Sequence, residues 1–474
     1  MELKTIEQRY REYLDTLPLS TLRILGRQEG MGQASSNNKD ALISAIIDLL
    51  TGKKQPAPRS NRGAPVKQTY LDPVVRAKIE EIRRQGTEEN RQRRNILEVA
   101  SGEERFAFDA PVYTGLLEIT GNGYGFIRTN GCRLSAEDIF VPAPVIHAQE
   151  LREGDFIACT VKPSRKNDSA EVAEILSVNG IAAGRGTRRP LFDTLRAQYP
   201  CEKFALSAGN GDIALRFLDL FVPIGKGQRA LVVAPPRAGQ TTLLKSIACA
   251  VRNNYPDVIL IVLLVDERPE EVTEFENSVR GAQIVWSSFD ESAEHHVRAA
   301  HLVIEHAKRM AEQGKDVFIL LDSLTKLTRA HNYLSENCGK TISGGLDPAA
   351  LSEPKRFFGA ARNTSEAGSI TIVASVSAES GNFFDDAVSE AFRGTGNAEI
   401  TLSRELAERR IFPAFDLGRC GTRKEELLLS AEELQALYRV RESRLTAPEV
   451  LDILRKTNDN AQLVADLSAF LNGK

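Results

Sequence analysis

The stretch ALVVAPPRAGQTTLLKSIACAVRNN, residues 230–254, decides the fold of this chain. It begins with an apolar strand, continues through a loop with a proline pair and Gly239, and ends in an amphipathic helix. A strand, a glycine-containing loop and a helix in this order are typical of a phosphate-binding loop, GxxxxGK(S/T). Gly239 lets the backbone approach a phosphate, and the helix N-terminus offers free N–H groups and a positive dipole end. The stretch therefore predicts a nucleotide site.

Two residues of this loop depart from the pattern. Ala234 replaces the first glycine, a mild change, and Gln240 replaces the lysine that reaches the β- and γ-phosphates. Glutamine donates a hydrogen bond but carries no charge to offset the charge that develops during phosphoryl transfer. Thr241 occupies the position of the hydroxyl group that holds Mg²⁺. The predicted nucleotide contacts of the loop are Arg237, Ala238, Gly239, Gln240, Thr241 and Thr242.

Downstream of this loop, apolar strands alternate with amphipathic helices. VILIVLLVD, DVFILLD and SITIVASV are nearly continuous apolar runs, which predict a parallel sheet covered on both faces. Asp322 ends DVFILLD, where such folds place the carboxylate that organises Mg²⁺, although a strand that ends in aspartate is common by chance. Glu267 follows VILIVLLVD and is a candidate for orienting the attacking water, whereas the charge pattern alone favours a solvated loop.

The first part of the chain changes character near residue 52. Residues 1–52 have helical spacing, with Asn38 or Asp40 as the start of the second helix, and predict a small helical bundle. Between residues 51 and 94 there are twelve Lys and Arg against five Asp and Glu. Residues 53–107 are therefore predicted to form a solvated basic linker, or alternatively a tethered arm that collects RNA.

Short strands dominate the next segment, residues 108–180. TGLLEIT, GYGFIRT, EDIFVPA and DFIACTV are separated by Gly, Asn and Pro, which predicts a small barrel of the OB or cold-shock type. Residues 181–474 then form the α/β core with helices at its C-terminal end. The fold class is thus an α/β phosphate-loop core with a parallel sheet, a small β-barrel and an N-terminal helical bundle.

Composition restricts the cellular setting. The formal net charge is −3, so a surface that binds a polyanion must be local. The six cysteines have no CxxC spacing, which gives no indication of a zinc or redox motif and suits a reducing compartment. No apolar run approaches the ~18–20 residues of a membrane helix, and the first residues lack the apolar segment of a signal peptide. We expect a cytoplasmic protein that does not contact a membrane.

Five segments together carry a resemblance to a known family. VVAPPRAGQT, LLVDERPEEVTE, ILLDSLTKLTRAHN, PKRFFGAARN and GTRKEELL follow one another between about residues 180 and 430. In order and spacing they resemble the RecA-like ATPase core of the bacterial transcription termination factor Rho, and GYGFIR resembles the RNA-binding domain of that family. The resemblance covers nearly the whole chain outside residues 53–107. Its DERPEEVTE and GTRKEELL segments are highly specific.

The resemblance implies a homohexameric, RNA-dependent ATPase and helicase that uses ATP and Mg²⁺. Such a protein binds nascent single-stranded RNA, moves along it 5′ to 3′ and releases the transcript, with RNA polymerase and its elongation factors as partners. By resemblance, Glu267 activates water and Asp322 is the Walker B aspartate. Arg423 is the arginine finger donated to a neighbouring subunit, Arg410 is a second arginine near the phosphates, and Phe412 packs on adenine.

Two RNA sites are also implied. Tyr124, Phe126 and Arg128 alternate along one strand and would share a face on which bases stack, with Asp138 as a hydrogen-bond acceptor for a base. The alternative is that one of the two aromatic residues belongs to the barrel core. A second site is the glycine-rich loop with Lys340 and Thr341, which resembles the loop that grips RNA in the ring channel; a flexible loop with a solvated lysine is the alternative. Phe383 stands where the family usually presents a lysine.

The two lost lysines leave two hypotheses. In the first, which we prefer, the protein is a working translocase in which Arg237 compensates for Gln240. In the second, it binds ATP and RNA but hydrolyses ATP slowly or not at all, and acts as a regulator or antagonist, for example within mixed rings. A rotary ATPase subunit, a recombinase and an RNA chaperone are rivals. The barrel motif and GTRKEELL disfavour the first two, and the ATPase core disfavours the third.

Overall fold

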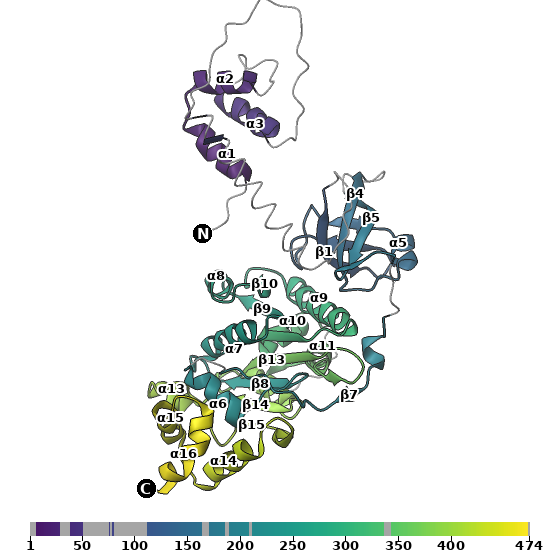
Figure 1. Ribbon diagram of the computed structural model, residues 1–474. Helices are drawn as coiled ribbons and strands as arrows, with labels where there is room; N and C mark the ends of the chain where they lie inside the picture. Colours follow the sequence, from purple (N-terminus) through teal and green to yellow (C-terminus); the bar gives the residue numbers. More distant parts are fainter. Residues whose placement is uncertain are drawn as a thin grey trace, which may run out of the picture. The chain divides into compact units, whose positions relative to one another are not determined.

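A computed structural model gives the fold of the 474-residue chain. It describes residues 6–28, 38–50, 75, 78–79, 111–163, 170–184, 189–207, 211–335 and 343–472. The chain divides into two compact units, residues 1–107 and 108–474 (Figure 1).

In residues 6–28 and 38–50 the first unit forms the helices α1 (Ile6–Asp15), α2 (Leu19–Gln28) and α3 (Lys39–Leu50). Asn38 begins α3, as predicted, because its side-chain oxygen accepts a hydrogen bond from the Ala41 N–H at 3.0 Å. The helices enclose an apolar core, which Val75 and Ile79 also join. The segment predicted as a solvated linker thus contributes two buried side chains to the helical unit, while most of residues 53–107 lies outside the described residues.

The second unit begins with a six-stranded sheet in the order β3-β2-β1-β4-β5-β6. Pairing between β3 and β5 closes it into a barrel, consistent with the predicted OB type. Alternate side chains, such as Leu117, Ile127 and Ile157, fill the interior. The elements are β1 (Tyr113–Ile119), β2 (Gly125–Arg128), β3 (Ile139–Val141), α5 (Ala143–Ala148), β4 (Phe156–Pro163), β5 (Ala170–Val178) and β6 (Ile181–Ala182).

The core is built on a seven-stranded sheet in the order β10-β9-β11-β13-β8-β14-β15. The first six strands of this order run parallel, and β15 pairs antiparallel with β14. This confirms the predicted parallel sheet. The strands are β8 (Arg229–Ala234), β9 (Ile259–Glu267), β10 (Gln283–Ser288), β11 (Val317–Asp322), β13 (Ile370–Ser377), β14 (Ala398–Thr401) and β15 (Gly421–Thr422), and a separate pair is formed by β7 (Ala197–Gln198) and β12 (Asn363–Thr364).

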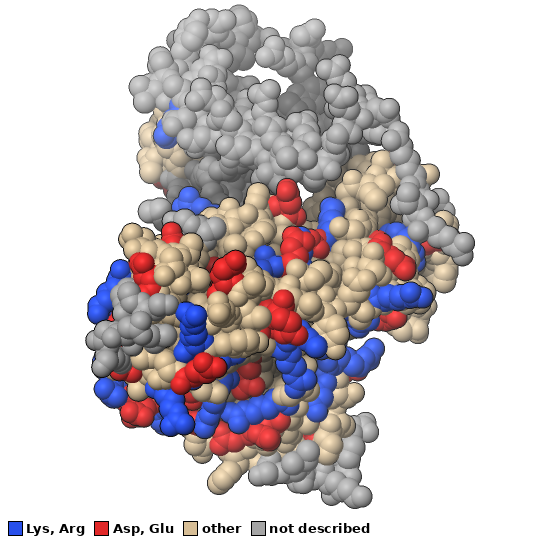
Figure 2. Space-filling view, turned by 60° about the horizontal axis from the view of Figure 1, so that its bottom comes forward, with Lys and Arg blue, Asp and Glu red and all other residues tan. Residues whose placement is uncertain are grey.

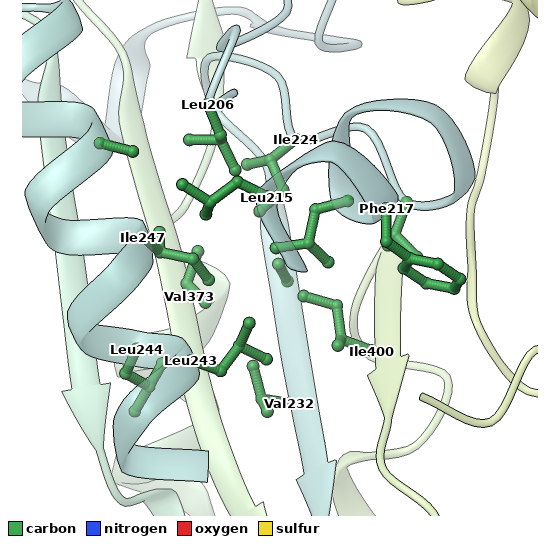
Figure 3. Close-up of a cluster of buried hydrophobic side chains, with 14 of the residues drawn as sticks. Leu206, Leu215, Phe217, Ile224, Val232, Leu243, Leu244, Ile247, Val373 and Ile400 are labelled. Atoms are coloured by element: carbon green, nitrogen blue, oxygen red, sulfur yellow. The ribbon is translucent and has the colours of Figure 1, made fainter. Parts of the chain in front are cut away.

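Both faces of this sheet are covered, which explains why its strands are continuously apolar. In β8, Val232 points into one buried cluster and Leu231 and Val233 into the other. Figure 3 shows Leu243 and Ile247 of α7 packed against the strands on the first face. The first cluster draws on α6 (Ile213–Phe221), α7 (Gln240–Asn254), α8 (Pro269–Ser278), α14 (Ala431–Glu442), α15 (Ala447–Lys456) and α16 (Asn460–Asn472). The second draws on α9 (Ala293–Glu312), α10 (Leu324–Leu334), α11 (Ser352–Gly359) and α12 (Phe383–Phe392).

The barrel is attached to α9 by polar contacts. His306 Nδ1 lies 2.9 Å from the carbonyl oxygen of Gly154, and Arg152 Nη1 lies 3.0 Å from Glu312 Oε2. The Glu312 side chain is fully buried and also accepts a hydrogen bond from the Phe192 N–H at 2.9 Å. These buried contacts hold the barrel and the α/β core in one compact unit.

The described surface carries mixed charge. Figure 2 shows Lys and Arg side chains interspersed with Asp and Glu over the face in view, in keeping with the net charge of −3. Within the described ranges, the chain has no helix of the length and apolar character that a membrane crossing requires.

Candidate nucleotide site and RNA-binding face

The phosphate loop connects β8 to α7, as predicted. Gly239 precedes the first residue of α7 and has a φ of 91°, a left-handed conformation that favours glycine. A Cβ at this position would lie 3.7 Å from the Phe412 ring, so Phe412 covers the turn. Phe412 is 40% exposed and borders the loop, where an adenine ring could stack on it.

Gln240 is held by the carboxylate predicted to organise Mg²⁺. Its side-chain Nε2 donates to Asp322 Oδ1 at 2.8 Å, and Ser375 Oγ donates to the same oxygen at 2.8 Å. Asp322 ends β11 and is buried, and this burial raises the pKa of its carboxyl group above the ordinary value. Glutamine thus supplies a hydrogen bond to Asp322 but leaves its negative charge unpaired.

Glu267 is the last residue of β9 and is only 7% exposed. The solvated-loop interpretation is therefore wrong for this residue, because β9 continues one residue further than the apolar run suggested. Burial raises the pKa of Glu267 to about 8, and a hydrogen bond with Glu271 adds to this effect. Lys326 Nζ forms an ion pair with Glu267 Oε2 and opposes the shift.

Sequence reasoning missed Lys326. It lies in the first turn of α10, where its backbone N–H donates to the Ser323 side chain at 3.2 Å. The motif DSLTK places this lysine four residues after Asp322, and that spacing was an available signal. Because β9 and β11 are neighbours, the turn that follows β11 brings Lys326 to the end of β9 and to Glu267.

The oxygen donors at this sheet edge suit Mg²⁺, which prefers a few protein oxygens and keeps water and phosphate ligands. Asp322 and the hydroxyl of Thr241, next to Gln240 in α7, are the candidate donors. Among the described residues there is no group of three or more His, Cys, Asp or Glu side chains that could hold a metal by itself. The residues therefore fit an ion held largely by a nucleotide.

Arg423 does not join the phosphate loop of its own chain. It follows β15, and Thr422 lies level with Ala398 of β14, which in turn pairs with Ala230 at the start of β8. The phosphate loop follows the opposite end of β8. Arg423 instead lies close enough to Arg229 to act on it electrostatically. The pKa of the Arg229 guanidinium group is lowered mainly by burial, and further by the positive charges of Arg362 and Arg423. Both Arg423 and Arg410 are exposed.

Three aromatic rings lie together on the outside of the barrel. Tyr124 and Phe126 have ring centroids 5.9 Å apart, and Phe140 lies 5.6 Å from Tyr124 and 5.8 Å from Phe126. All three are partly exposed, so neither predicted aromatic residue is a core residue. Phe140 was missed, although its alternation with Ile139 in EDIFVPA was a usable signal. The rings form a surface suited to stacking with unpaired bases.

Arg128 and Asp138 lie beside these rings but are bonded to each other. Arg128 Nη1 lies 2.6 Å from Asp138 Oδ2, and Arg128 also pairs with Glu118. Arg128 is only 7% exposed, and its guanidinium carbon lies 5.0 Å from the Phe126 ring centroid. The buried Asp138 Oδ1 has no hydrogen-bond partner among the described residues. Arg128 therefore supports the aromatic surface, and Asp138 keeps one free acceptor.

The predicted channel residues are only partly visible. Lys340 and Thr341 lie outside the described residues. Phe383 begins α12 and is 74% exposed. Gly344 lies against it, because a Cβ on Gly344 would come within 2.6 Å of the Phe383 carbonyl carbon. The exposed ring of Phe383 thus borders the end of the glycine-rich loop.

The geometry defines a phosphate-loop ATPase core joined to an oligonucleotide-binding barrel. Residues 214–421 match the nucleotide-binding domain of the ATP synthase alpha/beta family, and residues 113–183 match the RNA-binding domain of the Rho termination factor. Transcription termination factor Rho of Bacillus subtilis is 45% identical over 354 residues, which cover 73% of this chain and 83% of that protein. The chain belongs to the transcription termination factor Rho family.

Two further relatives bear the same name. The Haemophilus influenzae protein is 47% identical over 69% of this chain and 79% of its own length, and the Borreliella burgdorferi protein is 46% identical over 70% and 64%. A solved ATPase from a bacterial type III secretion system has a TM-score of 0.48 and 26% identity over 64% of this chain and 88% of that chain.

Proposed function

We propose that this protein terminates transcription as an ATP-driven RNA translocase. It loads on nascent single-stranded RNA through the aromatic face of the barrel, moves 5′ to 3′ and releases the transcript from RNA polymerase in the cytoplasm. One observation carries the proposal: a buried carboxylate pair, Glu267 and Asp322, lies at a phosphate loop in the same compact unit as three partly exposed aromatic rings in mutual contact.

The residues of the site divide the chemistry between them. Glu267, once deprotonated, accepts a proton from the water that attacks the γ-phosphate. Asp322 and Thr241 would hold Mg²⁺, which would offset the charge of the phosphates. Phe412 packs on the adenine ring. Because Arg423 lies at the opposite end of β8 from its own phosphate loop, it acts on the site of the next subunit, and Arg410 assists near the phosphates. This arrangement requires a ring, which we propose to be a homohexamer.

The test is ATP hydrolysis by the purified full chain, with and without cytidine-rich RNA. We expect RNA to stimulate turnover and Glu267→Ala to abolish it. Gln240→Lys should raise turnover, because it restores charge against the phosphates. Stimulated turnover that survives Glu267→Ala would contradict the proposed role of this carboxylate.

A second candidate function is favoured by Gln240 itself. A chain that binds ATP and RNA but hydrolyses ATP slowly would regulate or antagonise termination, for example within mixed rings with an active relative. Loss of a single cationic group at phosphoryl transfer costs about 10³–10⁵ in rate for arginine fingers. Turnover that is absent in the wild type but present in Gln240→Lys would favour this candidate over the first.

A further inference from the structure

The nucleotide site carries an excess of negative charge. Glu267 and Asp322 are buried at neighbouring strand ends, and Glu271 lies within hydrogen-bond reach of Glu267. Gln240 adds no positive charge to this group. A nucleotide triphosphate is itself a polyanion, so its terminal phosphates need a cation at this edge of the sheet.

Lys326 is a cation already inside the site. Its side chain is 27% exposed and pairs with Glu267, and its charge also acts on Asp322, where it lowers the pKa of that carboxyl group against the larger effect of burial. A lysine ammonium sits on a flexible four-carbon stem and can exchange one anionic partner for another without moving the backbone. Both buried carboxylates, Glu267 and Asp322, are therefore within the electrostatic range of Lys326.

Other cations near the phosphate loop are less well placed. Arg237 is exposed and forms no ion pair with any described residue. Lys245 of α7 is turned to the outer side of that helix, where it pairs with Glu274 and lies 5.6 Å from the Phe275 ring centroid. Arg268 is exposed at the start of α8. Lys326 therefore differs from them in being paired with one buried carboxylate, Glu267, while its charge also acts on the other, Asp322.

We propose that Lys326 replaces the missing lysine of the phosphate loop. Without nucleotide it neutralises Glu267, and with ATP it moves to the terminal phosphate. The exchange leaves the Glu267 carboxylate free to accept a proton from water, so the base is released only when the substrate is in place. The inference is an alternative to the expectation that Arg237 compensates for Gln240, and it rests on the proposed nucleotide-binding function of this site.

The test uses equilibrium binding of magnesium adenylyl-imidodiphosphate and of magnesium ADP to the full chain. We expect Lys326→Met to weaken binding of the triphosphate analogue at least ~10-fold and binding of ADP less than ~3-fold, because the lysine contacts the terminal phosphate. Gln240→Lys in the Lys326→Met background should restore most of the affinity for the analogue. Restoration by a charge on a different element separates phosphate binding from a structural role.

Two variants serve as controls. Lys308→Met removes a partly buried lysine that pairs with Glu305 outside the site and should leave both affinities unchanged. Arg237→Met tests the competing cation. The proposal is overturned if Arg237→Met, and not Lys326→Met, shows the selective loss. It is also overturned if Lys326→Met weakens both ligands equally or is not rescued by Gln240→Lys.

ATP hydrolysis by the same variants separates this inference from the proposed function. If no variant hydrolyses ATP but the binding pattern holds, the translocase proposal fails and the role of Lys326 stands. If the wild type hydrolyses ATP and Lys326→Met retains both affinity and turnover, the translocase proposal stands and the role of Lys326 fails.

Discussion

Glutamine at position 240 supplies a hydrogen bond but no positive charge. Its amide satisfies Asp322 with a hydrogen bond of 2.8 Å, so the buried carboxylate is not left without a donor. The charge is supplied elsewhere, since Lys326 reaches the site from the turn after β11. The lost lysine thus leaves the geometry of the strand ends intact while it changes which residue meets the phosphate.

We expect the ionisation of Glu267 to set the pH dependence of ATP turnover. Because burial raises its pKa to about 8, the ionisation of this carboxyl group is complete only above that pH, and the fraction able to act as a base increases as the pH rises. We expect kcat/KM to increase through an inflection near pH 8, and Glu271→Gln to move the inflection lower, since an amide donor stabilises the carboxylate. The measurement is kcat/KM for ATP from pH 6 to 9.5. An inflection unmoved by Glu271→Gln would belong to another group.

The same shift has a consequence for stability. A carboxyl group whose pKa is raised by folding favours the folded state below its unfolded pKa, and this contribution is lost as the pH rises through the folded value, here about 8. Glu267→Gln removes the titrating group. We expect its advantage in thermal unfolding temperature over the wild type to grow as the pH rises from 4.5 to about 8 and to level off above that, in the absence of nucleotide. An advantage that does not change with pH would contradict the raised pKa.

RNA affinity should depend separately on each of the three aromatic rings of the barrel, Tyr124, Phe126 and Phe140. Phe126→Ala and Phe140→Ala each remove a stacking surface, worth about 1–3 kcal/mol per base, or roughly 5- to 150-fold in affinity. Fluorescence anisotropy with a short cytidine oligonucleotide measures the loss. Tyr438→Ala, which removes an exposed ring on α14, is the matched control and should bind normally. Equal binding by Phe140→Ala and the wild type would exclude Phe140 from the RNA site.

At the scale of elements, the sequence predicted what periodicity and turn chemistry determine. The apolar runs of β8, β9 and β11, the helices α7 and α9, and the strands of the barrel follow from local pattern, because burial on one or two faces sets that pattern. Contacts between the ends of different strands do not follow from local pattern. Lys326 meets Glu267 only because β9 and β11 are neighbours, and Arg128 is buried because Glu118 and Asp138 come from two adjoining segments. Spacing within one strand cannot show such pairings.

The junction between barrel and α9 is a second property of elements. Gly154 has a φ of 83°, and a Cβ there would lie 2.4 Å from the backbone of Glu305 and His306. Gly184 has a φ of 81°, but a Cβ added to it would have no atom within 4 Å. Both alanine variants incur left-handed strain of about 1–2 kcal/mol, and Gly154→Ala must also displace the barrel from α9.

We therefore expect Gly184→Ala to lower the thermal unfolding temperature by about 2–5 °C, and Gly154→Ala by at least about twice as much. Hydrogen exchange should increase along α9 near His306 in Gly154→Ala and not in Gly184→Ala. Equal destabilisation by the two variants would mean that the barrel does not depend on this contact.

At the scale of the whole molecule, the role proposed for Arg423 requires a second subunit. Arg423 lies level with the start of β8, about 13 Å of strand from the phosphate loop at the other end, at ~3.3 Å per residue. A subunit packed against that edge would receive the exposed guanidinium group. Neither composition nor the fold of a single chain predicts such a neighbour, so the finger role of Arg423 was predicted only through the resemblance.

Mixing two inactive variants tests the shared site. Arg423→Ala keeps Glu267 and lacks the finger, while Glu267→Gln keeps the finger and lacks the base. In rings assembled from equal amounts, about a quarter of the interfaces join an intact Glu267 to an intact Arg423, because each subunit contributes to two interfaces. We expect RNA-stimulated turnover to reappear after the two are unfolded or dissociated and assembled together. The matched control pairs each variant with the double variant Arg423→Ala/Glu267→Gln, a combination that forms no complete interface. Turnover no higher in the mixture than in these controls would show that Arg423 does not act across the interface.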